Sequence, residues 1–161
     1  MNPLGTSRGF LVGGFIVALA LEVLRLPIWA EPARPAWVVT LLVFWCLNAP
    51  QRVNVGSAFL LGMLLDVLKG TLLGQYALAL VIVAFLAARF HLQVRVFPLW
   101  QQTTAVGLLT LLAGAILWWT DGITGHPSNP LLRVPSALTT ALLWPWLSEL
   151  LRSMRRRTDP L

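Results

Sequence analysis

Long apolar runs separated by short polar breaks restrict the fold of this chain more than any other feature. Four runs contain no charged residue, and they cover residues 10–21, 38–47, 77–88 and 105–119. A membrane-spanning helix needs about 20 mostly apolar residues, whereas strands of a membrane barrel alternate apolar and polar residues over about ten positions. The runs show no such alternation. They therefore predict an all-α, polytopic bundle of membrane helices.

The composition indicates the same class. Of the 161 residues, 57% are hydrophobic and 11% are charged, whereas soluble domains average about 25% charged residues. The length suits one domain, and we predict a single integral membrane domain over residues 1–161. The sole cysteine, Cys46, lies in an apolar run, which excludes a disulfide framework and a cysteine-based metal site.

Proline, glycine and charged residues divide the chain into about six predicted membrane helices. These cover residues 10–26, 36–49, 53–69, 71–90, 99–119 and 135–151. The second and third are short for a span, which leaves a count of five open. Gly70 is placed to end the third helix in a left-handed cap, and Pro135 to lie in the first turn of the sixth.

Basic residues are distributed unevenly between the two ends of the predicted helices. With six spans, eight Lys and Arg residues fall on the side of both termini and four on the other side. Because basic residues concentrate on the cytoplasmic side, both termini are predicted to be cytoplasmic. The arginines after the sixth span are predicted to contact anionic lipid headgroups rather than nucleic acid.

The sequence offers no catalytic or metal-binding constellation. The two histidines, His91 and His126, fall in loops on opposite predicted faces, and no HExxH, GxSxG, SxxK or P-loop pattern occurs. We therefore predict no enzyme activity, no cofactor and no metal. Asp121, Gly122 and Gly125 are interpreted as an outer-face turn.

Two acids within the predicted helices need partners, because a carboxylate at the centre of a membrane helix costs about 2.5–3.5 kcal/mol. Glu22 stands three residues before Arg25, and Asp66 stands three residues before Lys69. The spacing predicts a local ion pair of Glu22 with Arg25. For Asp66 two interpretations stay open, a pair with Lys69 or a carboxylate held against donors of a closely packed helix, and the glycine spacing around it favours the second.

The segment GMLLDVLKGTLLG (residues 62–74) places three glycines and one acid at every fourth position. On a continuous helix these positions share one face, and small residues at this spacing let another helix approach closely. We predict a packing seam along Gly62, Asp66 and Gly70. A neighbour from the same chain is favoured over a second molecule, which leaves a homodimer open.

Residues 45–78, WCLNAPQRVNVGSAFLLGMLLDVLKGTLLGQYAL, resemble the core of the rod shape-determining protein MreD family. The likeness includes the link that contains Arg52 and Asn54 and the glycine ladder that ends at Gly74. Two later stretches, RVFPLWQQ (95–102) and WWTDGITG (118–125), resemble the later part of proteobacterial members, so that the likeness covers most of the chain.

The resemblance implies a non-enzymatic, multi-pass component of the bacterial inner membrane that takes part in cell-wall elongation. Family members associate with the bitopic protein MreC and, through it, with an actin-like filament and peptidoglycan synthases. The resemblance also implies a six-helix fold similar to the substrate-binding subunits of energy-coupling-factor vitamin transporters. It places Arg52, Asn54 and the ladder in a helix-packing or partner motif.

Two functions remain open from the residues themselves. A scaffold needs an exposed lateral groove and no solute cavity, whereas a transporter subunit that binds a vitamin or small solute needs a polar pocket that opens outward. The predicted outer loops are short and hold few hydrogen-bond donors. The sequence therefore predicts a scaffold without a polar pocket.

Overall fold

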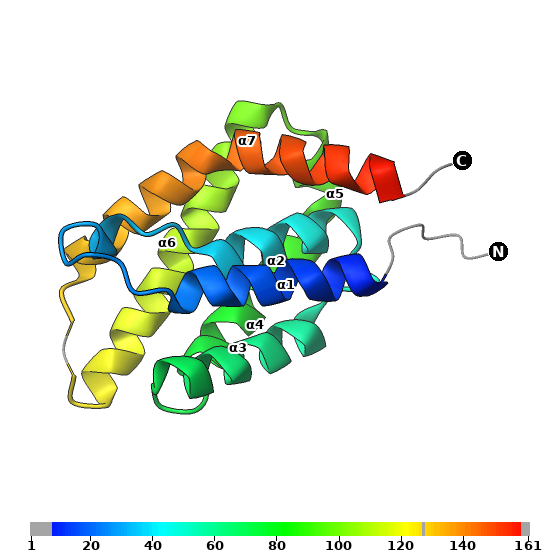
Figure 1. Cartoon of the computed structure of the whole chain (residues 1–161). Helices are drawn as coiled ribbons and strands as arrows, with labels where there is room; N and C mark the ends of the chain where they lie inside the picture. Colours follow the sequence, from blue (N-terminus) through cyan, green and yellow to red (C-terminus); the bar gives the residue numbers. More distant parts are fainter. Residues whose placement is uncertain (1–7, 127, 159–161) are drawn as a thin grey trace.

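The computed structural model describes residues 8–126 and 128–158, and this part of the chain is a bundle of helices without a strand (Figure 1). The α-helices are α1 (Arg8–Val23), α2 (Trp37–Asn48), α3 (Val55–Lys69), α4 (Gln75–Arg89), α5 (His91–Val96), α6 (Leu99–Ile123) and α7 (Val134–Thr158). Two short 3-10 helices, η1 (Glu31–Ala33) and η2 (Pro130–Arg133), lie in the loops. The prediction of an all-α fold is confirmed.

Each of the six predicted segments corresponds to one helix, with ends that differ by a few residues, except that α7 continues well beyond residue 151. The short α5 was not predicted. Pro135 lies in the first turn of α7 and Pro145 lies inside that helix. Within the described residues, α6 is the one helix long and apolar enough to cross a membrane, and α4 is apolar but shorter.

Helix α2 forms the centre of the bundle. Every residue from Val38 to Leu47 is buried, and α2 contacts α1, α4, α5, α6 and α7. The Phe44 ring packs edge-to-face on Trp45 and Trp144, at centroid distances of 5.2 and 6.3 Å. A helix that is apolar around its whole circumference is stable only where other helices enclose it.

The remaining helices pack around α2 mainly as neighbours along the chain, with α3 on α4 and α6 on α7. Helix α1 begins and α7 ends at the same end of the bundle (Figure 1). That end also brings Arg95, Arg152 and Arg156 together around Asn48. Residues that the sequence assigned to one face therefore meet at one end of the molecule.

Candidate functional site

The acid in the glycine-rich segment, Asp66, has a structural role: its buried carboxylate caps the first turn of α4. The side chain is fully buried. It accepts hydrogen bonds from Thr71 Oγ1 (2.8 Å), Gly74 N (2.8 Å), Tyr76 N (3.0 Å) and Ala77 N (3.4 Å). The first N–H groups of a helix lack partners within the helix, and the positive end of the helix dipole favours a carboxylate there. Asp66 therefore joins the end of α3 to the start of α4.

Gly62 allows the backbones of α3 and α4 to approach each other closely. A Cβ at this position would lie 2.5 Å from Ala77 N and 2.8 Å from the carbonyl carbon of Tyr76. These are backbone atoms, so they cannot yield as a flexible side chain would. The neighbour at Gly62 belongs to the same chain.

Gly70 and Gly74 lie outside the helices and have a different role from Gly62. Gly70 ends α3 with a φ of 65°, as expected for a left-handed cap, and Gly74 precedes α4 with a φ of 108°. L-residues rarely adopt such angles, which makes glycine the favoured residue here. Apart from its chain neighbours, no atom of the described residues lies within 4 Å of a Cβ built on Gly70, so the structure places Gly70 in a turn rather than in the packed seam with Gly62.

The link before α3 contains the other two residues of the predicted motif. Asn54 caps α3, since its Oδ1 accepts from Gly56 N (3.0 Å) while its own N–H donates to Ser57 Oγ (2.9 Å). This reciprocal arrangement is a capping box. Arg52 is half-buried in the loop just before it.

The predicted outer-face turn is partly helical. Asp121 and Gly122 belong to the last turn of α6, and Gly125 follows with a φ of 77°. The carboxylate of Asp121 accepts from Arg133 Nη2 (2.6 Å) and Ser128 Oγ (2.8 Å). Asp121 therefore ties α6 to the start of α7, and its interpretation as a simple turn residue was wrong.

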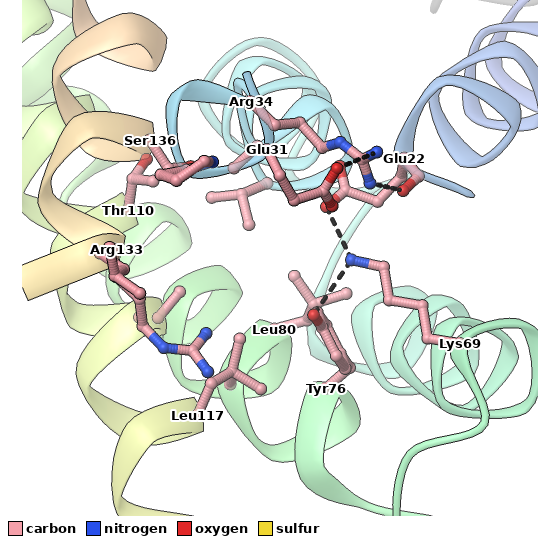
Figure 2. A pocket seen from close by; sticks show the side chains of 17 residues that line it. Glu22, Glu31, Arg34, Lys69, Tyr76, Leu80, Thr110, Leu117, Arg133 and Ser136 are labelled. Carbon is pink, nitrogen blue, oxygen red and sulfur yellow. Dashed lines mark hydrogen bonds and ion pairs between the residues drawn. The ribbon is translucent and has the colours of Figure 1, made fainter. Parts of the chain in front are cut away.

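A polar cavity of about 220 Å³ lies beside Glu22, near the end of α1. Figure 2 shows the side chains that line it. Its lining residues come from α1, η1, α2, α3, α4, α6, η2 and α7 and from the loop after η1. The charged ones are Glu22, Glu31, Arg34, Lys69 and Arg133. Val39, Leu80 and Leu117 supply apolar surface. The prediction that the protein lacks a polar pocket was wrong. That prediction rested on the few hydrogen-bond donors in the loops, whereas charged residues at helix ends line the cavity.

Around the cavity, Arg34 forms a local ion pair with Glu31, whereas Lys69 joins helices that are distant in the sequence. Lys69 Nζ lies 3.1 Å from Glu22 Oε1 and donates to the Tyr76 hydroxyl at 3.0 Å. The predicted local pair of Glu22 with Arg25 was therefore wrong. Of the two interpretations of Asp66, the pair with Lys69 does not form, and the carboxylate is held by backbone donors of α4 instead. The lysine instead connects α3 to the end of α1.

Three buried atoms of the cavity lining have no hydrogen-bond partner within the described residues, namely Glu22 Oε2, Arg34 Nε and Arg133 Nε. Leaving a buried polar group unpaired costs about 1–3 kcal/mol, and more for a charged group. Gly114 makes room for Arg133, because a Cβ there would lie 3.3 Å from the Arg133 Cβ.

An apolar groove of about 470 Å³ runs between α1 and α7, with α2 as its floor. One wall is formed by Gly9, Gly13 and Gly14 of α1, and the opposite wall by Leu147 and Leu151 of α7. Helices α1 and α7 make no substantial packing contact with each other within the described residues. The groove is therefore an open lateral face of the bundle.

Comparison with known proteins identifies the family. The model of the family described as rod shape-determining protein MreD matches residues 7–154. The chain belongs to the MreD family. The rod shape-determining protein MreD of Haemophilus influenzae is 31% identical over 143 residues, which are 89% of this chain and 88% of that protein. No solved structure matches the chain.

Membership in the MreD family confirms the resemblance on residues 45–78 and links the chain to rod shape determination. The family is one of membrane proteins. Among the described residues of this MreD-family chain, no group of three or more His, Cys, Asp or Glu side chains is placed to hold a metal ion.

Sequence reasoning missed the polar residues that meet in the cavity of this MreD-family protein. Glu22, Lys69 and Arg133 lie on three different helical segments and share no motif. One signal could have grouped them, because all three fall near predicted helix ends on the same face. Tyr76, the sole tyrosine, carried no such signal.

Proposed function

We propose that this MreD-family protein is a non-enzymatic scaffold of the rod-shape machinery in the bacterial inner membrane, and that it holds a single-span, MreC-like partner. The observation that carries the proposal is the apolar groove between α1 and α7. Through that partner the scaffold would connect to an actin-like filament and to peptidoglycan synthases.

The chemistry of the groove suits a transmembrane helix. Packing between helices in a membrane depends on close backbone approach, which small residues such as glycine allow. Gly13 is exposed in the groove, and no atom of another described element lies within 4 Å of a Cβ built on it. This exposed position of α1 gives a helix of another protein a place to approach the backbone closely.

The charge distribution supports six crossings with both termini in the cytoplasm. Arginines gather at the end where α1 begins and α7 ends, and the acids Glu22 and Glu31 lie with Lys69 in the cavity at the other end. With Cys46 changed to Ser, single cysteines in Leu131→Cys and Ser153→Cys should be labelled by an impermeant reagent from opposite sides. Labelling of both from one side would contradict the topology.

The scaffold proposal is tested by co-purification of the tagged protein with the MreC-like protein of the same organism. Gly13→Leu fills the groove and should lower recovery of the partner at least tenfold while the protein stays folded. Gly122→Leu is the matched control, because this helical glycine also has no atom within 4 Å of its Cβ and lies outside the groove. Equal recovery with both variants would sink the proposed docking surface.

A second candidate function is favoured by the polar cavity. A substrate-binding subunit of a vitamin or small-solute transporter would need such a cavity, and the likeness to energy-coupling-factor subunits stays a prediction. Purification from native membranes separates the two candidates. Recovery of ATP-hydrolysing subunits would favour a transporter, whereas recovery of the bitopic partner would favour the scaffold.

A further inference from the structure

We propose that the polar cavity is a binding site for a small zwitterion, a molecule of amino-acid size that carries both an ammonium and a carboxylate group. This inference does not depend on the scaffold proposal, because the cavity and the apolar groove are lined by different residues.

The two charged walls of the cavity determine the ligand class. Figure 2 shows the Glu22 carboxylate and the Lys69 ammonium on one side and the Arg133 guanidinium on the other. Glu22 is 8% exposed, and its Oε2 is buried without a partner although its Oε1 is paired with Lys69. That oxygen can accept from an ammonium group.

The opposite wall offers a donor. Arg133 Nη2 is held by Asp121 at 2.6 Å, and its buried Nε has no hydrogen-bond partner within the described residues. A guanidinium fixed in this way keeps its planar donor set in one orientation, which suits a carboxylate. Gly114 keeps the Arg133 stem close to α6, since any side chain there would press on it.

A ligand with one kind of charge fits the cavity less well. A simple anion would leave Glu22 Oε2 unpaired and would meet the negative charges of Glu22 and Glu31, and a simple cation would meet the positive charges of Arg34, Lys69 and Arg133. A zwitterion can satisfy both walls. Val39, Leu80 and Leu117 line the apolar part of the cavity, where a short hydrocarbon stem can lie.

The size of the cavity limits the ligand. Pockets for drug-sized ligands usually measure about 300–1,000 Å³, and this one measures about 220 Å³. An amino acid suits this volume, whereas a vitamin of two or more fused rings does not.

The proposal is tested by isothermal titration of the purified full-length protein in detergent. The probes are L- and D-amino acids, together with propylamine and propionate, which each carry a single charge. At least one amino acid should bind saturably, and the two singly charged probes should bind at least tenfold more weakly. Absence of saturable binding up to millimolar concentrations, or equal binding by a singly charged probe, would overturn the assignment.

Variants locate the binding in the cavity. Glu22→Gln and Arg133→Gln should each weaken affinity at least tenfold, while Glu149→Gln and Arg89→Gln, at exposed positions outside the cavity, should leave it unchanged. If the first two variants unfold, Ser136→Leu decides the question, because it fills the cavity and leaves all three ion pairs intact. A folded Ser136→Leu protein that binds like the wild type would overturn the proposal.

Discussion

Two surfaces of this bundle are formed by helical glycines, and one is closed while the other is open. At Gly62 of α3 the backbone of α4 occupies the space that a side chain would need. At Gly13 of α1 no atom of another described element lies within 4 Å of a Cβ, although α7 forms the opposite wall of the same groove. Small residues on a helix therefore show where another helix can approach, and they do not show whether that helix belongs to the same chain.

The difference follows from the connections of the helices. Helices α3 and α4 are joined by a short turn in which Gly70 and Gly74 adopt positive φ angles, and the buried Asp66 caps α4 from the side of α3. Helices α1 and α7 lie at opposite ends of the sequence, and α7 packs mainly on α6 instead. The turn and the Asp66 cap hold α4 against Gly62 of α3. Within the described residues, no corresponding turn or cap holds α7 against Gly13 of α1.

The largest effect on folding is expected for Gly62→Leu. Overpacking typically costs about 1–3 kcal/mol and occasionally more, and here the obstructing atoms belong to the backbone of Tyr76 and Ala77. We expect the free energy of unfolding to fall by about 3 kcal/mol or more. Unfolding in mixed detergent micelles, followed by tryptophan fluorescence, measures this loss. Wild-type stability of the variant would show that α3 and α4 can separate without cost.

A smaller but clear loss is expected for Asp66→Asn. The carboxylate accepts four hydrogen bonds, and such bonds in membrane proteins average about 0.6 kcal/mol each. Because the amide nitrogen of Asn would face donors, we expect a loss of about 2 kcal/mol. Thr71→Val removes a single donor and should cost about a quarter as much in the same assay. Equal losses for the two variants would mean that the carboxylate does not act as the cap of α4.

The α3–α4 hairpin shows how much of the structure could be predicted from the sequence. The helix boundaries, the left-handed cap at Gly70 and the close approach at Gly62 all follow from local spacing and glycine chemistry. The predicted seam holds at Gly62 and at Asp66, whose carboxylate accepts from Tyr76 N and Ala77 N of α4. It does not extend to Gly70, because α3 ends at Lys69 and the four-residue spacing continues into a turn. Periodicity alone does not show where a helix stops.

The polar cavity shows what could not be predicted. Its ion pairs join Glu22 to Lys69 and Asp121 to Arg133 across separate helices. The sequence instead favoured the nearby Arg25 as the partner of Glu22, and Asp121 was interpreted as a turn residue. Pairing between helices depends on which helix ends share an end of the bundle and how far each extends, and such packing is not encoded in any single segment.

The smallest effect on folding is expected for Gly13→Leu, which makes the same substitution as Gly62→Leu on the open surface. Surface changes away from packed features usually stay within about 0.5 kcal/mol, and no atom of the described chain lies within 4 Å of the new Cβ. Gly13→Leu should therefore unfold like the wild type in the micelle assay that detects Gly62→Leu. A loss near that of Gly62→Leu would mean that α1 and α7 close on each other in the isolated protein. The groove would then be an internal contact, and the partner helix would need another surface.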